Sequence, residues 1–234
     1  MTSFPTTRWS MILAARDGST TEARAALEEL CRDYWPPIYA FVRHIGHDPD
    51  EALDLTQGYF ERLLEKDFLR SVDPRAGRFR SFVLVSVKHH ISHERERSRA
   101  QKRGGRAIQL SLDADEAERR YRAQAVDYET PERTFERRWA ITVLDRAMER
   151  VRDGYASRGK LDEFDELKPM LTGTPEPGHY HDLAVRLAVT DSAIKVAVHR
   201  LRRRFGEALR HEVEELVASP DEVENEMREI LAAL

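Results

Sequence analysis

Apolar side chains recur at steps of three and four residues along most of this 234-residue chain, and this period constrains the fold more than any other feature. Such spacing places apolar residues on one face of an α-helix, whereas a half-buried strand would alternate apolar and polar residues. No segment alternates in that way, and the sequence holds no internal repeat. The pattern therefore predicts an all-α protein with a core made by amphipathic helices.

Prolines and capping residues divide this pattern into segments. Pro36 and Pro37 lie within the first apolar stripe, and we expect them to kink or break the helix. Asp48 followed by Pro49 is a typical helix start, and Thr130 followed by Pro131 repeats that signal. The segments predict a first helical domain at 1–105, a linker or small insert at 106–130, a second helical domain at 131–211 and an acidic extension at 212–234, with an amphipathic helix near 221–233.

Charge is segregated along the chain, although the formal net charge is only -4. Residues 70–106 hold eleven Lys or Arg against three acids, and residues 195–210 hold six against one. Residues 212–234 hold eight acids and one arginine. Two separate basic segments are typical of nucleic-acid-binding surfaces, with solvated helix faces as the alternative. Two hypotheses follow for the acidic extension: its acids shield the neighbouring basic segment at 195–210, or its helix caps the helical bundle.

The second basic segment follows the pattern of a helix-turn-helix, with an ordinary helical hairpin as the alternative. In "YHDLAVRLAVTDSAIKVAVHRLRRRF", a short turn separates two apolar stripes, and Thr190 suits the N-cap of the second helix. Ala188 stands where the turn often has glycine, so we expect a different turn geometry. The second helix of such a motif enters the major groove of DNA. The side chains predicted to face DNA there are Ser192, Lys195, Val196, His199, Arg200, Arg202 and Arg203.

Few features favour an enzyme. His89 and His93 are one helical turn apart, the spacing of two metal ligands, but no third ligand is evident nearby. The sequence has no glycine-rich phosphate loop and no nucleophile elbow. Cys31 is the only cysteine, and no apolar run approaches the ~20 residues that span a bilayer. We therefore predict a cytoplasmic protein without enzymatic activity, cofactor, metal or membrane insertion.

Three stretches carry a family resemblance: "YWPPIYAFVRHIGHDPDEALDLTQGYFERLLEKD", "DPRAGRFRSFVLVSVKHHISHERERSRAQKR" and "AVRLAVTDSAIKVAVHRLRRRF". In this order the chain resembles bacterial extracytoplasmic-function sigma factors, in particular a subgroup with long tails. The resemblance implies a sigma region 2 bundle at 1–105 and a region 4 helix-turn-helix at 131–211. It also implies a function: directing core RNA polymerase to specific promoters and assisting promoter melting.

The resemblance implies roles for three sets of side chains. The seven residues of the helix-turn-helix would read the upstream (minus-thirty-five) promoter element as duplex. A second set would contact the melted downstream (minus-ten) element, and we expect its helical members on the exposed side of their helix: Arg75, Arg78, Arg80, Lys88, His89, Arg95 and Arg99. A third set would dock on the largest polymerase subunit: Asp54, Gln57, Glu61, Arg62 and Glu65.

The expected partners are core RNA polymerase and promoter DNA; control by an anti-sigma protein or another regulator is left open. A helix-turn-helix regulator that never docks on polymerase is the alternative function. Such regulators usually bind palindromic sites as symmetric dimers. The two basic segments differ in sequence, which does not favour a symmetric dimer, so no obligate homo-oligomer is expected.

Overall fold

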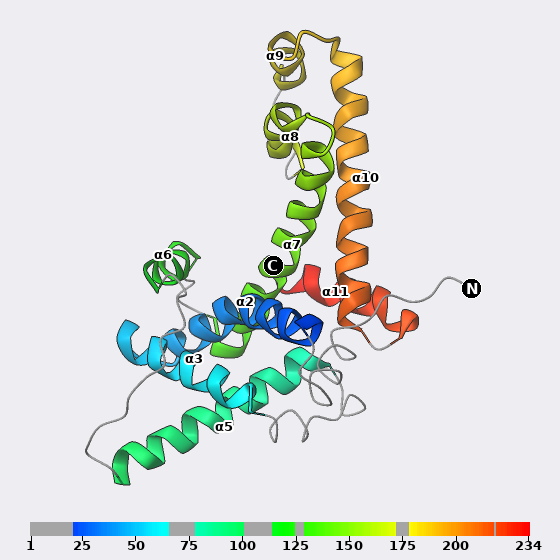
Figure 1. The fold of residues 1–234 in the computed structure, drawn as a ribbon. Coiled ribbons are helices and arrows are strands. Elements are labelled where there is room, and N and C mark those ends of the chain that lie inside the picture. Colours follow the sequence, from blue (N-terminus) through cyan, green and yellow to red (C-terminus); the bar gives the residue numbers. More distant parts are fainter. Residues whose placement is uncertain (1–20, 66–77, 101–113, 125–128, 172–177, 218) are drawn as a thin grey trace. The chain divides into compact units, whose positions relative to one another are not determined.

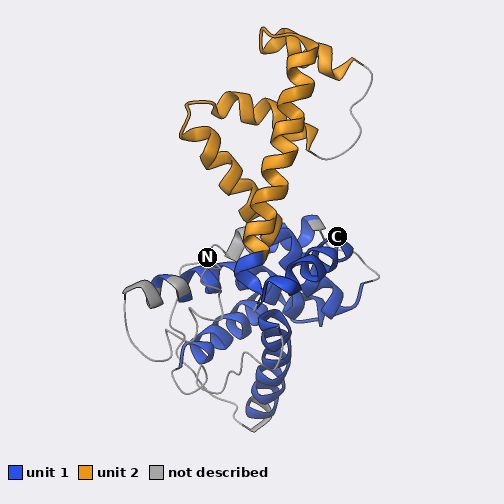
Figure 2. Cartoon of the chain, turned by 90° about the vertical axis from the view of Figure 1, so that its right-hand side faces the viewer, with its two compact units in different colours: residues 1–142, 214–234 blue, residues 143–213 orange. Residues whose placement is uncertain are grey.

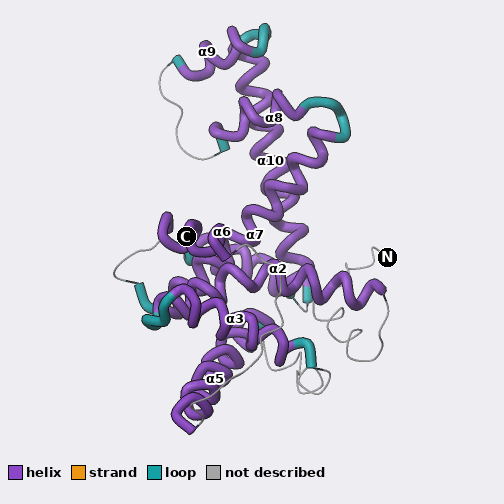
Figure 3. Tube along the Cα trace, turned by 60° about the vertical axis from the view of Figure 1, so that its left-hand side comes forward, coloured by secondary structure: helices purple, strands orange, loops and turns teal. Residues whose placement is uncertain are grey.

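The computed structural model describes residues 21–65, 78–100, 114–124, 129–171, 178–217 and 219–234. Over these residues the protein contains nine α-helices and two 3₁₀ turns, and no strand (Figure 3). The all-α fold predicted from the apolar period is therefore confirmed. Among the described helices, none combines the length and apolar character that crossing a bilayer would require.

Figure 1 labels the described helices and colours them from blue to red in the order of the chain. They are α2 (Thr21–His44), α3 (Pro49–Leu63), α5 (Phe79–Ala100), α6 (Ala114–Gln124), α7 (Pro131–Ala156), α8 (Leu161–Leu167), α9 (His179–Arg186), α10 (Asp191–Leu216) and α11 (Val223–Ala232). The 3₁₀ turns cover Lys168–Met170 and Pro220–Glu222.

Contacts along the chain define two compact units (Figure 2). Unit 1 takes residues 1–142 together with 214–234, and unit 2 takes residues 143–213. Both cuts fall inside long helices, α7 and α10, whereas the sequence analysis placed its boundaries at the stretch 106–130 and after residue 211. The C-terminal extension thus belongs to the same unit as the N-terminal helices.

Two predicted helix starts are confirmed. The Asp48 carboxylate accepts a hydrogen bond from the backbone N–H of Glu51 at 2.9 Å, and Pro49 is the first residue of α3. The Thr130 hydroxyl accepts one from the N–H of Arg133 at 3.2 Å, just ahead of α7. These side chains satisfy N–H groups that lack a partner within the helix.

Of the kink or break expected at Pro36 and Pro37, the break does not occur, because α2 runs through both prolines to His44. An interior proline costs a helix about 3 kcal/mol, while burying one large apolar side chain contributes about 1.5–3 kcal/mol. Several such side chains flank the prolines, and Trp35 among them stacks on Phe60 of α3 with ring centroids 5.5 Å apart. Tertiary packing here outweighs the local preference of the sequence. The almost fully buried neighbours are Tyr34, Trp35, Ile38 and Tyr39.

Helices α2, α3 and α5 share the core of unit 1. Tyr34 of α2 meets Phe79 of α5 edge to face, with ring centroids 5.3 Å apart. The hydroxyls of Tyr59 on α3 and Ser86 on α5 are 2.7 Å apart. These contacts place α3 and α5 against each other, with one face of each still available to solvent.

The stretch 106–130 contains an ordered helix, α6, that docks on α2. The Glu118 carboxylate accepts hydrogen bonds from the Tyr39 hydroxyl at 2.7 Å and from Nε of Arg43 at 2.9 Å. The bonds from Arg43, above all, lower the pKa of Glu118 to about 2. The described part of this stretch is therefore a small ordered insert, the alternative to a plain linker.

Unit 2 is built from the C-terminal half of α7, with α8, α9 and most of α10. Tyr155 of α7 packs against Phe164 of α8, with ring centroids 5.5 Å apart. The Glu212 carboxylate of α10 is buried, and it accepts hydrogen bonds from Nε of Arg146 at 2.9 Å and Nε of Arg150 at 2.8 Å. This pairing ties α10 to α7 within the unit.

Candidate nucleic-acid interface

The turn between α9 and α10 is tight and passes through one left-handed residue. Ala188 has φ 53°, in the left-handed region that favours glycine. The N–H of Val189 donates to the carbonyl of Ala184 at 2.9 Å, and the N–H of Ala188 donates to that of Val185 at 3.2 Å. This pair of bonds is a Schellman motif. The expectation that alanine here changes the turn is therefore wrong: the turn keeps its form with a strained alanine.

The second helix begins as predicted and exposes the predicted face. The Thr190 hydroxyl accepts a hydrogen bond from the N–H of Ala193 at 3.2 Å. Ile194, Val198 and Leu201 are buried in unit 2. All seven side chains predicted to face DNA are exposed: Ser192, Lys195, Val196, His199, Arg200, Arg202 and Arg203.

Not all of these basic side chains are equally available for a new partner. Both Nε and Nη2 of Arg202 donate to the carbonyl of Met170, at 3.2 and 2.8 Å. Arg203 meets Glu207 at 3.5 Å with both side chains mostly in solvent, and Lys195 lies 6.0 Å from the ring centre of Tyr180. Solvent-exposed pairs of this kind contribute about 0–1 kcal/mol, so Arg203 and Lys195 can leave these partners at little cost.

The first basic segment is only partly exposed. His89 and Arg95 lie in solvent on α5, and Nη2 of Arg95 is 3.2 Å from Nε2 of His47. Lys88 is half-exposed and pairs with Glu132 at 2.6 Å. Two more predicted contacts cannot be placed: Arg75 lies outside the described residues, and the side chain of Arg99 is not described.

We expected Arg80 on the exposed side of α5, and this expectation is wrong. The residue is only 6 % exposed and lies within unit 1. Its guanidinium lies 4.6 Å from the ring centre of Trp139, and its Nε pairs with Glu136 at 2.9 Å. The same group pairs with Glu226 and Glu229 of α11. Burial lowers the pKa of Arg80, and its three carboxylate partners provide the counter-charge.

The sequence carries a signal for this burial, which the prediction of an exposed Arg80 did not use. Arg80 precedes Val83 by three residues and Val87 by seven, which places it on the same stripe as these buried valines. Arg78, just ahead of the helix, is half-buried and pairs with Glu226 at 3.0 Å and with Glu229. The α11 helix itself forms as predicted, and Glu226 and Glu229 on it meet the first basic segment. The shielding of the segment 195–210 stays a prediction.

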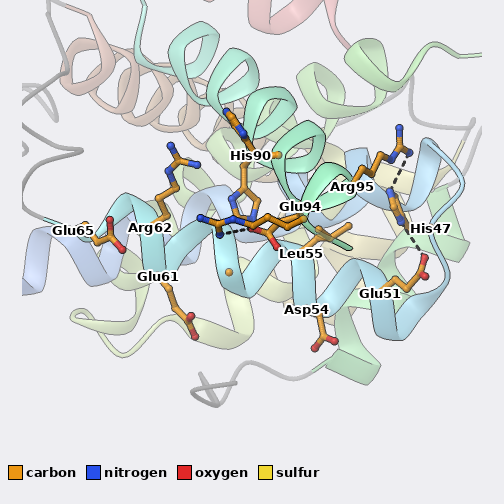
Figure 4. A pocket seen from close by; sticks show the side chains of 13 residues that line it. His47, Glu51, Asp54, Leu55, Glu61, Arg62, Glu65, His90, Glu94 and Arg95 are labelled. Carbon is orange, nitrogen blue, oxygen red and sulfur yellow. Dashed lines mark hydrogen bonds and ion pairs between the residues drawn. The ribbon is translucent and has the colours of Figure 1, made fainter. Parts of the chain in front are cut away.

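A groove of about 1100 Å³ runs between α3 and α5 (Figure 4). Its α3 side carries the acids Glu51, Asp54, Glu61 and Glu65, and Figure 4 shows Asp54 and Glu61 pointing to the side of α3 away from α5. Four of the five residues predicted to bind polymerase line this groove: Asp54, Glu61, Arg62 and Glu65.

Gln57, the fifth predicted residue, is 6 % exposed and does not line the groove. It belongs to the buried face of α3, next to Thr56, which is also buried. The expectation that Gln57 is exposed with the other docking residues is therefore wrong, because its place in the helix turns it towards the core.

His90 of α5 lies at the groove between the two helices, pointing towards α3 in Figure 4. Its side chain is buried, its ring centre is 5.9 Å from that of Tyr59, and burial lowers its pKa. His89 and His93, the pair at metal-ligand spacing, are exposed. Over the described part of the chain, no three His, Cys, Asp or Glu side chains gather as a metal site.

No family model, no curated protein and no solved structure matches this chain.

Proposed function

We propose that this protein is a sigma factor that directs bacterial core RNA polymerase to promoters and assists their melting. The observation that carries the proposal is the α9–α10 pair. It combines a Schellman turn with a capped second helix, and that helix exposes the seven predicted side chains. An exposed basic face on the second helix is the geometry that places side chains at base edges and phosphates in a major groove.

In this proposal, unit 2 reads the upstream promoter element as duplex. Phosphate contacts from Arg200 and Arg203 would fix the register of the helix, and side chains nearer its start would meet the bases. Val196 is 46 % exposed among cationic neighbours, and an apolar group there suits the methyl group of a thymine. The finer division into a region 2 bundle and a region 4 motif belongs to the same proposal.

The α3–α5 groove of unit 1 would receive the polymerase. Its α3 side is rimmed by the carboxylates of Asp54, Glu61 and Glu65, and a basic segment of the partner would complement them. The exposed face of α5, with Lys88, His89 and Arg95, would follow the backbone of the melted strand. The reaction is thus recruitment and strand separation, in which the chain breaks no covalent bond.

The test combines binding and transcription. Purified core polymerase is expected to retain the full-length protein on an affinity column, and Asp54→Arg is expected to weaken retention. Glu28→Arg is the matched control, because Glu28 is an exposed carboxylate on α2 of the same unit. With core polymerase and a randomised promoter pool, the protein should enrich two spaced sequence elements among the transcripts.

Failure of core polymerase to bind the wild-type chain would refute the proposal. Binding to a palindromic duplex without polymerase would instead identify a helix-turn-helix regulator. Equal loss of retention in Asp54→Arg and Glu28→Arg would show that the groove is not the polymerase-docking surface. The proposed role of the helix-turn-helix would not be affected.

A further inference from the structure

Two arginines of unit 1 converge on the carboxylates of the C-terminal helix. Arg78 pairs with Glu226 at 3.0 Å, and both Arg78 and Arg80 pair with Glu229. Arg80 also pairs with Glu226. Two guanidinium groups facing one anionic oxygen is an arrangement that also binds a phosphate, because both anions accept charge-assisted hydrogen bonds from the same donors.

Glu229 differs from Glu226 in its surroundings. Glu226 is buried, whereas the side chain of Glu229 is 40 % exposed while it meets both arginines. Glu229 therefore lies where the arginine pair opens to solvent. An incoming phosphate would reach the arginines from this side and would meet this carboxylate first.

We propose that α11 competes with DNA for these arginines. In the chain alone, Glu226 and Glu229 occupy Arg78 and Arg80, and single-stranded promoter DNA gains both arginines only after α11 is displaced. This inference rests on the proposed function, since the sigma-factor resemblance is what places Arg78 and Arg80 at the downstream element. It places a regulatory contact in the C-terminal extension.

The size of α11 suits a helix that can be released. It spans ten residues, and isolated helices shorter than ~12–15 residues are marginal in water, so its order depends on its packing. Its apolar anchors are Val223 and Ile230, both almost fully buried, whereas Leu231 is 57 % exposed. If only a fraction of the molecules can bind DNA, the apparent affinity for DNA is the intrinsic affinity multiplied by that fraction.

The first experiment removes the competing charge. Full-length wild type, Glu229→Gln and Asp221→Asn are titrated against a fluorescein-labelled single-stranded oligonucleotide of mixed sequence, followed by fluorescence anisotropy. Asp221 is an exposed acid in the 3₁₀ turn ahead of α11, so its variant makes the same change in net charge. Glu229→Gln is expected to bind about threefold or more tightly, roughly the effect of one added phosphate contact, and Asp221→Asn to match wild type.

The second experiment loosens the apolar anchor without changing charge. Ile230→Ala is expected to raise oligonucleotide affinity, and Leu231→Ala, at the exposed neighbouring position, is the matched control. Circular dichroism verifies that each variant is folded. Hydrogen exchange of the wild type adds a direct measure of displacement: amides of residues 223–232 should exchange faster when the oligonucleotide is bound.

Equal affinities within each matched pair would overturn the competition, as would unchanged exchange in α11 on binding. Absence of oligonucleotide binding in every variant would overturn it too. Retention on core polymerase is measured on the same samples. If core polymerase retains the protein but Glu229→Gln does not raise oligonucleotide affinity, the competition by α11 is refuted and the sigma-factor function stands. If Glu229→Gln raises the affinity but polymerase does not retain the protein, the sigma-factor function is refuted and the competition for Arg78 and Arg80 stands.

Discussion

The basic segments at the start of α5 and along α10 are both rich in arginine but have opposite surroundings. Arg78 and Arg80 face carboxylates of α11, and Arg80 is buried. Arg200 and Arg203 of α10 are exposed, and the carboxylate that Arg203 meets, Glu207, is exposed on the same helix. A count of cationic residues treats the two segments alike, so it cannot say which one is ready to bind phosphate.

The two segments differ in the acidic side chains that folding brings near them. Glu226 and Glu229 lie about 150 residues along the chain from Arg78, and only tertiary structure brings them together. On α10, the acid nearest in sequence to Arg203 is one turn away and exposed. A basic surface is therefore defined as much by its uncompensated charge as by its arginines.

The largest effect is expected where the buried pair is broken. Glu226→Ala leaves Arg80 buried with less counter-charge, and breaking a buried ion pair costs about 3–5 kcal/mol. The matched change on α10, Glu207→Ala, removes an exposed partner of Arg203 and should alter stability by about 0.5 kcal/mol or less. Urea denaturation followed by circular dichroism measures both. Similar losses in the two variants would remove the contrast between the segments.

A second contrast concerns one histidine from each helix, His90 buried on α5 and His199 exposed on α10. Because burial lowers the pKa of His90, the unfolded chain takes up a proton at this residue more readily than the native state. Stability should therefore fall as pH decreases below about 6.5, by at most about 1.4 kcal/mol per pH unit.

The measurement is urea denaturation at pH 7 and pH 5.5. His90→Leu should flatten the pH dependence, and His199→Leu should leave it as in the wild type. A pH dependence that survives in His90→Leu would show that other groups control it. The charged groups acting on His90 are Glu94, Arg62 and Arg97, of which Glu94 favours the protonated form.

Local sequence signals predicted much of the fold because they act over a few residues. The caps at Asp48 and Thr130 and the amphipathic helix near 221–233 are read from neighbours three or four positions away. The uninterrupted α2 depends on packing partners far along the chain, so the sequence did not reveal it. The burial of Arg80 could be read from the stripe that it shares with Val83 and Val87, but its carboxylate partners on α11 could not. The candidate site divides in the same way: the exposed face of α10 follows from helical period, whereas the pairing of α11 does not.

Ala188 adopts a backbone conformation that alanine disfavours, so substitutions there measure the cost of this conformation. The alanine holds a left-handed conformation, which costs an L-residue roughly 1–2 kcal/mol, part of which the entropy of glycine in the unfolded chain would offset. Ala188→Gly should therefore stabilise the protein by about 0.5–1 kcal/mol. Ala193→Gly, at an exposed helical position of α10, should destabilise it by about 1 kcal/mol. Thermal denaturation of the two variants should show midpoints moving in opposite directions.

The smallest expected effect concerns duplex DNA and tests which of the two basic segments binds it. Arg203→Ala should weaken binding to a mixed-sequence DNA duplex by about threefold and reduce the slope of log affinity against log salt by about 0.9, the value for one phosphate contact. Arg78→Ala should leave both quantities unchanged, because its guanidinium is already paired with Glu226 and Glu229. Anisotropy titrations between 50 and 200 mM salt measure both quantities. Equal slopes in the two variants would mean that a duplex engages both segments, and the acids of α11 would then not withhold Arg78 from duplex DNA.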